Sequence, residues 1–248
     1  MAFGFPIPSV RSRHANVDAL LLPPPRGTLH RRKPRHRRAI DSAHEPSQTL
    51  KVTKRLLDMI GASVGLIVFG PLMIGIAMAI KWTSPGPVLF QQKRYGYHNR
   101  RFWIYKFRTM YVHLEDQRGT RQTTNDDPRV TPLGRILRKT SLDELPQLIN
   151  VFKGDMSLVG PRPHVPGMLA GGMLYEELTP YYFQRHNMRP GVTGLAQISG
   201  FRGSTVVPDS AIERLDCDLR YIEGWSFWLD LRIIMRTVVR ELFAGSGD

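Results

Sequence analysis

Apolar and charged positions divide the chain into three parts. Residues 1–50 show no sustained apolar period, contain several prolines and carry more basic than acidic side chains. A stretch with this composition cannot bury enough apolar surface to fold, so it predicts a disordered basic N-terminal arm. Residues 51–82 are dominated by an apolar run, and residues 83–248 alternate between short apolar segments and turns. We expect a membrane-associated helical segment followed by one folded domain.

The apolar run at residues 59–80 holds 22 positions without a charge. As a helix with a rise of about 1.5 Å per residue it would be roughly 33 Å long, enough for the hydrocarbon core of a bilayer. Gly70 and Pro71 stand at its midpoint, where proline removes a backbone donor and bends or breaks a helix. Basic residues flank both ends, which favours the cytoplasmic side for both. The pattern favours a re-entrant helix-break-helix that enters one leaflet and returns; an ordinary kinked span and a buried helix of a soluble protein are the alternatives.

The remaining segments predict a small α+β domain. Residues 88–110 are rich in aromatic and β-favouring side chains around Gly96 and Asn99, which predicts a short β-hairpin. The sequence predicts helices at residues 133–139, 143–153 and 211–243, the last interrupted near Gly224. The predicted fold class is therefore α+β and mostly helical, with a re-entrant membrane segment, a small β-hairpin and amphipathic interfacial helices.

The C-terminal segment combines acidic and aromatic residues in an amphipathic pattern. Its aromatic side chains are Tyr221, Trp225, Phe227 and Trp228. Aromatic residues are enriched where a protein meets the interface between membrane and water, so the pattern suits an interfacial helix. Packing into the core of the domain explains most of these rings equally well.

Charge narrows the possible partners. The chain has 35 Lys plus Arg against 21 Asp plus Glu, a formal net charge of +14. Such a basic protein is expected to meet nucleic acid, a phosphate-bearing substrate or an acidic membrane surface. The basic residues are interleaved with the membrane segment and match no base-reading module, so we expect no nucleic-acid partner. Cys217 is the single cysteine, which excludes a disulfide framework and a cysteine-rich zinc module.

Two adjacent acids, Asp143 and Glu144, stand near the expected start of a helix. A start at residue 142 or 143 would place Pro146 in the first turn, where its missing donor costs little. The carboxylates would then lie at the positive end of the helix dipole, which keeps them ionised. Ionised carboxylates can coordinate Mg²⁺ or attack phosphorus. Simple capping of the helix is the alternative from spacing alone.

A loop rich in glycine and proline follows this helix and carries Arg162 between two prolines. A guanidinium stiffened in this way is suited to hold a phosphate through two hydrogen bonds. Pairing with a neighbouring acid is the alternative. Further cations recur beside apolar residues, among them Lys106, and their number favours polyphosphate or lipid headgroups as ligands.

Five motifs occur in order along the chain: KRLLDMIGA, YKFRTM, DPRVTPLGRILRKTSLDELPQLINVFKGDMSLVGPRP, RPGVTGLAQISG and WSFWLDLRI. Together, over residues 54–243, they resemble the bacterial sugar transferases known as monotopic phosphoglycosyl transferases. The resemblance implies a re-entrant segment at residues 51–82 and a catalytic domain at residues 83–248, on the cytoplasmic face of the bacterial inner membrane. Family members often have Ser-Pro at the break, whereas Gly70 and Pro71 stand here, so a hydroxyl that could satisfy freed carbonyls is missing.

The resemblance implies an activity as well as a fold. A phosphoglycosyl transferase of this family moves a hexose 1-phosphate from a UDP-sugar to undecaprenyl phosphate and releases UMP, as the first membrane step of exopolysaccharide or glycoconjugate synthesis. The segment at residues 197–203 looks most like members that use UDP-glucose, with UDP-galactose as the alternative. Anionic membrane lipids are further expected partners, and a homodimer is expected by analogy alone.

The resemblance also implies roles for individual residues. Asp143 would attack the β-phosphorus and form a covalent phosphosugar intermediate, and Asp143 and Glu144 would together hold Mg²⁺. Arg162 and Arg138 would bind the substrate phosphates, with Lys106 and Asp230 in supporting roles. Two other functions stay open: a membrane-associated scaffold without catalysis, and a glycosyltransferase that releases UDP instead of UMP.

Overall fold

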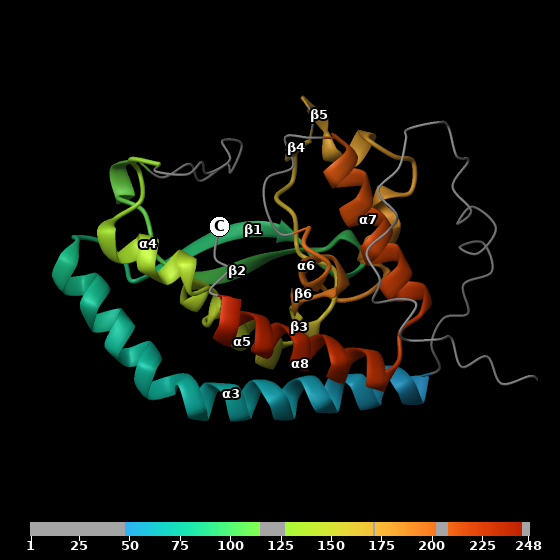
Figure 1. Ribbon diagram of the computed structural model, residues 1–248, viewed down its shortest axis with the longest axis horizontal. Coiled ribbons are helices and arrows are strands. Elements are labelled where there is room, and N and C mark those ends of the chain that lie inside the picture. Colours follow the sequence, from blue (N-terminus) through green and yellow to red (C-terminus); the bar gives the residue numbers. More distant parts are fainter. Residues whose placement is uncertain (1–47, 115–126, 171, 202–207, 245–248) are drawn as a thin grey trace, which may run out of the picture.

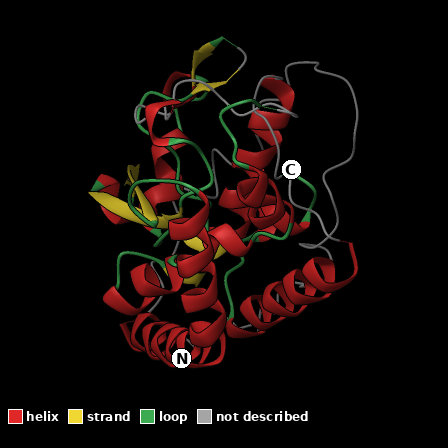
Figure 2. Ribbon diagram, turned by 90° about the vertical axis from the view of Figure 1, so that its left-hand side faces the viewer, coloured by secondary structure: helices red, strands yellow, loops and turns green. Residues whose placement is uncertain are grey.

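The computed structural model describes residues 48–114, 127–170, 172–201 and 208–244. Helices make up most of this part of the chain, and the strands are short (Figure 2). The class is α+β and mostly helical, as predicted. Residues 1–47 of the predicted basic arm lie outside the described residues, and residues 48–50 already belong to the first described helix.

The secondary-structure elements are labelled as in Figure 1. The helices are α3 (Gln48–Thr83), α4 (Pro132–Lys139), α5 (Gln147–Lys153), α6 (Leu195–Ile198), α7 (Pro208–Glu223) and α8 (Phe227–Ala244). The strands are β1 (Leu89–Tyr95), β2 (Arg101–Phe107), β3 (Ser157–Val159), β4 (Leu169–Ala170), β5 (Met173–Leu174) and β6 (Gly191–Thr193). They form three separate pairs: β1 with β2 and β4 with β5 are antiparallel, and β3 with β6 is parallel.

The long helix α3 runs along the base of the molecule and bends before its C-terminal end (Figure 1). It is one continuous helix that contains Pro71. A proline cannot donate to the carbonyl one turn earlier, and its ring crowds that carbonyl, which accounts for a bend within an uninterrupted helix. The interruption predicted at Gly70 and Pro71 is therefore a bend, and the chain does not leave the helical conformation there.

Much of the apolar surface of α3 is exposed. Ile67 is 76% exposed and Trp82 is 84% exposed, and the helix is long and apolar enough to cross a membrane. A soluble protein seldom leaves a contiguous apolar surface of this kind uncovered. The predicted alternative of a buried helix in a soluble protein is wrong, because only 11% of the most apolar stretch of α3 is buried. The protein is membrane-associated through this helix.

The N-terminal half of α3 is tied to the folded domain by polar side chains of the KRLLD motif. Arg55 donates to the backbone oxygens of Val151 at 2.6 Å and Phe152 at 2.7 Å, at the end of α5. The last carbonyls of a helix have no partner within it, so a guanidinium stabilises them. One turn further on, Asp58 accepts a 2.9 Å hydrogen bond from the hydroxyl of Ser157 in β3. The membrane helix and the domain are thereby joined.

The predicted hairpin is confirmed as β1 and β2, which pair in register from Leu89 with Phe107 to Tyr95 with Arg101. Its turn contains Asn99, whose φ of 62° is a left-handed conformation that asparagine tolerates better than most residues. Side chains alternate between the two faces of a strand. One face therefore carries Arg94 and Lys106, which line the same pocket.

The segment that carries the two acids differs from the prediction. Residues 142–144 form a 3₁₀ turn, and α5 begins only at Gln147. The backbone N–H groups of Leu145, Leu148 and Ile149 each bond to the carbonyl three residues earlier. Pro146 explains this, because it has no N–H to donate to residue 142, as an α-helix starting there would require. The expected helix start at residue 142 or 143 is therefore wrong, and the acids precede α5.

The C-terminal segment forms two helices separated near Gly224, as predicted. Their inner faces share a core with β3 and α6, in which Tyr221 and Leu229 are buried. Trp228, by contrast, is 66% exposed at the start of α8. The aromatic residues of this segment are thus divided: some pack into the core, and others remain available to a membrane interface.

Candidate active site

The two acids meet cations from two distant segments. Lys106 in β2 places its Nζ 2.7 Å from Glu144 Oε1 and 3.8 Å from Asp143 Oδ2. Arg162, in the loop after β3, places Nη2 2.6 Å from the same Glu144 oxygen and Nη1 3.3 Å from Oε2. Four of the predicted site residues therefore form one cluster. Both predicted alternatives for Arg162 meet here, since it pairs with an acid at the edge of a basic pocket.

The two carboxyl groups have different electrostatic surroundings. Burial raises the pKa of Asp143 above its ordinary value, and Lys106 opposes this shift while Glu144 adds to it. Burial alone would also raise the pKa of Glu144, but Arg162 and Lys106 hold it well below its usual range. Glu144 is thus a fixed anion, whereas Asp143 keeps a more basic carboxylate with fewer direct partners. A more basic carboxylate is a better nucleophile once it is ionised.

The loop that carries Arg162 is held by hydrogen bonds to four consecutive carbonyls. The oxygens of residues 161 and 164 accept from the backbone N–H groups of Gly191 at 2.9 Å and Tyr95 at 3.0 Å. The oxygens of residues 162 and 163 accept from the guanidinium groups of Arg185 at 2.6 Å and Arg94 at 3.3 Å. Two of these donors, Arg94 and Tyr95, belong to β1, and the other two, Arg185 and Gly191, lie further along the chain, so the position of Arg162 is fixed by the tertiary structure.

A buried ion pair lies behind this loop. Arg185 Nη2 is 2.5 Å from Asp218 Oδ2, and the two side chains are only 1% and 2% exposed. The other terminal nitrogen of Arg185 donates to His164 Nδ1. Burial, with Arg185 next to it, holds the pKa of His164 well below its ordinary value, so the imidazole is neutral and can accept. The two residues are 33 positions apart, and no pattern in the sequence pairs them.

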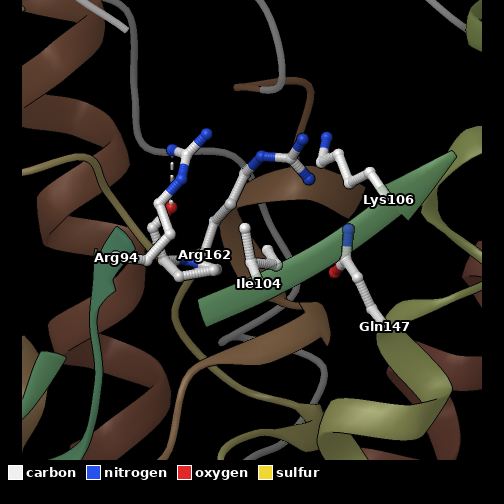
Figure 3. A pocket seen from close by; sticks show the side chains of 6 residues that line it. Arg94, Ile104, Lys106, Gln147 and Arg162 are labelled. Atoms are coloured by element: carbon white, nitrogen blue, oxygen red, sulfur yellow. Dashed lines mark hydrogen bonds between the residues drawn. The ribbon is translucent and has the colours of Figure 1, made fainter. Parts of the chain in front are cut away.

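Arg94 lines a small pocket with Lys106, Gln147 and Arg162. Figure 3 shows the guanidinium groups of Arg94 and Arg162 and the amine of Lys106 on the same side of the hairpin strand. Sequence analysis missed Arg94, which it counted only among the basic residues after the membrane segment. The available signal was strand alternation in the predicted hairpin, which puts Arg94 on the face of Lys106 and Lys93 on the opposite face.

The structure places the two remaining predicted residues differently. Arg138 in α4 donates from Nε to the hydroxyl of Thr109 at 2.9 Å and lowers the pKa of Asp143, so it lies near the cluster. Asp230 in α8 instead accepts from Lys54 Nζ at 2.6 Å and the hydroxyl of Tyr221 at 2.7 Å. These contacts fasten α8 to α3. A supporting role of Asp230 at the substrate phosphates stays a prediction.

The donor set determines what kind of metal ion could bind. The described residues contain no group of three or more His, Cys, Asp or Glu side chains arranged to hold a metal by themselves. Mg²⁺ commonly keeps several waters and binds through one or two carboxylates together with substrate phosphates. The adjacent Asp143 and Glu144 fit that mode, with Glu144 Oε2 less engaged than Oε1. The residues therefore fit a Mg²⁺ ion whose shell is completed by phosphate.

Comparison with known proteins places the chain in a family. Residues 49–244 match the bacterial sugar transferase family. The exopolysaccharide production protein PSS of Rhizobium leguminosarum bv. phaseoli is 52% identical over 79% of this chain and 98% of its own length. The undecaprenyl-phosphate glucose phosphotransferase of Komagataeibacter xylinus is 50% identical over 77% of this chain and 36% of its own length. A UDP-glucose:undecaprenyl-phosphate glucose-1-phosphate transferase of Caulobacter vibrioides is 47% identical over 78% of this chain and 71% of its own length.

The chain belongs to the bacterial sugar transferase family, as its motifs predicted. It spans nearly the whole of the Rhizobium relative and about a third of the Komagataeibacter relative. Within the family it is a phosphoglycosyl transferase, the class to which its named relatives point.

Proposed function

We propose that this protein transfers a hexose 1-phosphate from a UDP-sugar to undecaprenyl phosphate and releases UMP, at the first membrane step of exopolysaccharide or glycoconjugate synthesis. One observation carries the proposal: the buried Asp143 and the fixed anion Glu144 are surrounded by Lys106, Arg162 and Arg138. A carboxylate beside a row of cations is suited to chemistry on a diphosphate. The names of the relatives favour UDP-glucose as the donor, with UDP-galactose as the second candidate.

In the first step, an Asp143 oxygen attacks the β-phosphorus of the UDP-sugar. A bond forms between the carboxylate and phosphorus, and the bond from phosphorus to the bridging oxygen breaks, so that UMP leaves with the electron pair. Burial of Asp143 and its limited direct pairing support this role, because both keep the carboxylate basic. Lys106 and Arg162 lie where they can stabilise the charge that develops on the phosphate oxygens.

In the second step, an oxygen of undecaprenyl phosphate attacks the same phosphorus. The bond between phosphorus and Asp143 breaks, the carboxylate is restored, and a polyprenyl diphosphate sugar is formed. The acceptor phosphate is anionic, so the same cations can hold it beside the reacting phosphorus. Mg²⁺, held by Asp143 and Glu144 with phosphate oxygens, would screen the negative charge of the diphosphate.

We propose that α3 is re-entrant and that the enzyme acts on the cytoplasmic face of the inner membrane. The bend in α3, the exposed apolar side chains along it and the basic residues on both flanks support this arrangement. The contacts of Arg55 and Asp58 keep the first part of α3 against the domain. The reaction would then take place next to the leaflet that holds the lipid acceptor.

The direct test supplies purified protein in nanodiscs with Mg²⁺, undecaprenyl phosphate and a panel of UDP-sugars, and identifies the released nucleotide. We expect UMP with UDP-glucose, and its loss in Asp143→Asn. As a matched control, Asp155→Asn removes a carboxylate that pairs with Lys153 at the surface and should leave UMP release unchanged. Release of UDP would indicate a glycosyltransferase, and no turnover with any sugar would favour a scaffold.

A further inference from the structure

Arg94 is a cation whose charge no carboxylate balances directly. Its Nη2 donates to the side-chain oxygen of Gln92 at 2.5 Å and its Nη1 to the carbonyl of Pro163 at 3.3 Å. Its Nε–H is buried and has no hydrogen-bond partner among the described residues. Arg94 also makes no ion pair with any carboxylate of the part of the chain that the structure describes, whereas Lys106 and Arg162 share Glu144.

A partly buried guanidinium without a carboxylate in direct contact is unfavourable in the free protein. Burial, and next to it the charge of Arg162, lower the pKa of Arg94 to about 10, although the charge of Glu144 acts in the opposite direction. Burial and Arg162 both oppose the charged form that the free protein still carries at neutral pH. The arrangement becomes favourable when an anion enters, because one anion can neutralise two neighbouring cations and accept the unused donor.

The position of Arg94 indicates which anion would neutralise its charge. Arg94 and Arg162 line the same pocket, together with Lys106, and their charged groups lie on one side of the hairpin strand (Figure 3). Lys106 and Arg162 are already engaged at Glu144, next to Asp143. Arg162 lies between Arg94 and Lys106 in this view, so the three cations form a row along the pocket.

We propose that Arg94 and Arg162 form a second phosphate-binding subsite, next to the one at Asp143 and Glu144. This inference rests on the proposed function, which requires two phosphate groups besides the one that is transferred: the nucleotide phosphate that leaves with UMP and the monophosphate of the lipid acceptor. Both present the same oxyanion to a guanidinium. The subsite takes one of these two phosphates, and the kinetic measurements below identify which.

The first experiment measures binding without turnover. Inorganic pyrophosphate is titrated calorimetrically into the full chain in detergent, for the wild type, Arg94→Gln and Lys93→Gln. Lys93→Gln is the matched control, because it removes the same charge one residue away. Lys93 lies on the opposite face of β1, over the ring of Trp103. We expect Arg94→Gln to weaken pyrophosphate binding by about 10-fold or more and Lys93→Gln to change it less than about 2-fold. Equal affinities of the two variants would overturn the proposal.

The second experiment separates contact with phosphate from support of the loop, since Arg94 also holds the carbonyl of Pro163. The same titration is made with Arg162→Gln and with the double variant. If Arg94 binds phosphate itself, the substitution Arg94→Gln weakens pyrophosphate binding further in a protein that already carries Arg162→Gln. No further loss in the double variant would mean that Arg94 acts only by positioning Arg162, and would overturn the subsite. Should Arg94→Gln fail to fold, Arg94→Lys replaces it, and an unchanged pyrophosphate affinity would then contradict the proposal.

The third experiment identifies the phosphate. The KM values for UDP-glucose and for undecaprenyl phosphate are measured separately for Arg94→Gln and Lys93→Gln. An increase confined to one substrate in Arg94→Gln assigns the subsite to the phosphate of that substrate, and no increase for either contradicts it. Pyrophosphate binding needs no turnover, so the two proposals can fail separately. If the wild type releases no UMP, but Arg94→Gln still weakens pyrophosphate binding, the proposed function is refuted and the subsite is kept.

Discussion

Two charged clusters lie on opposite sides of the loop at residues 161–164, and they use the same residue types differently. Behind the loop, Arg185 and Asp218 form an ion pair that is almost completely buried, and the buried Arg214 is a second cation near the same carboxylate. In front of it, Lys106 and Arg162 share Glu144, and among the described residues Asp143 has a single cation within 4 Å and Arg94 forms no ion pair. The first cluster is closed to solvent, whereas the cations of the second line a pocket that a ligand can reach.

We infer from this difference that the cluster behind the loop supports the fold and that the cluster in front of it binds the substrate. A dehydrated ion pair fixes the loop, because removing either partner would leave a buried charge uncompensated. A cluster with excess cations and a buried acid is less favourable in the free protein, and it improves when a phosphate-bearing ligand arrives. The loop connects the two, since Arg185 holds the carbonyl of the residue whose side chain reaches Glu144.

The largest effect is expected at Asp143. Asp143→Asn keeps the size of the side chain and removes the nucleophile, so transfer should fall by about 10³-fold or more while the fold persists. Steady-state release of nucleotide measures this, with Asp155→Asn as the control. A residual rate within about 10-fold of the wild type would place the nucleophile elsewhere.

Loss of the buried ion pair between Arg185 and Asp218 should lower the stability of the fold. Asp218→Asn leaves Arg185 buried without its carboxylate, which should lower the free energy of unfolding by about 3–5 kcal/mol. Thermal or chemical denaturation in detergent measures this, with Asp209→Asn, exposed at the start of α7, as the control. If both variants were equally stable, the pair would not be the scaffold that holds the loop.

Substitution of Arg162 should lower activity and leave the stability of the fold nearly unchanged. Arg162→Lys keeps the charge and loses the planar fork, so kcat/KM should fall by about 10-fold to 100-fold with little change in stability. Comparison with Arg101→Lys, an exposed arginine on the hairpin, controls for the substitution itself. A loss of stability as large as that of Asp218→Asn would erase the distinction between the two clusters.

The smallest effect is a change in pH dependence. Lys106 lowers the pKa of Asp143, against the larger effect of burial, which raises it. Removing the ammonium in Lys106→Gln should raise this pKa further. Because attack requires the ionised carboxylate, the acid limb of kcat/KM should move to higher pH in the variant. An acid limb that stays in place, measured against Lys93→Gln, would show that Asp143 does not control it.

Local patterns in the sequence were sufficient to predict the larger elements, but not the short strands β3 to β6 or helix α6. The hairpin, the helix at α4 and the two C-terminal helices follow from turn residues and apolar periodicity, and the motifs indicated Asp143, Glu144, Lys106 and Arg162. The start of α5 was wrong because Pro146 changes the hydrogen-bond pattern of the preceding turn, which a simple first-turn placement does not consider.

The rest depends on pairs of residues that are far apart in sequence. Asp230 was predicted to have a supporting role at the site, which stays a prediction; its contact with Lys54, 176 residues away, fastens two helices together and could not be foreseen. The pairing of Arg185 with Asp218 and the position of Arg94 beside Arg162 are likewise tertiary facts. Spacing along one chain carries no information about such partners, although it can indicate that a cation or an acid is present.

The central claim is that Asp143 carries the sugar phosphate during the reaction, and intact-protein mass spectrometry tests it most directly. The full chain is incubated with Mg²⁺ and UDP-glucose without lipid acceptor, and undecaprenyl phosphate is then added. We predict a mass increase of one hexose phosphate, located on the peptide that contains Asp143, absent in Asp143→Asn and lost when the acceptor is added. An unmodified wild-type protein that nevertheless transfers sugar phosphate when the acceptor is present would contradict the covalent mechanism.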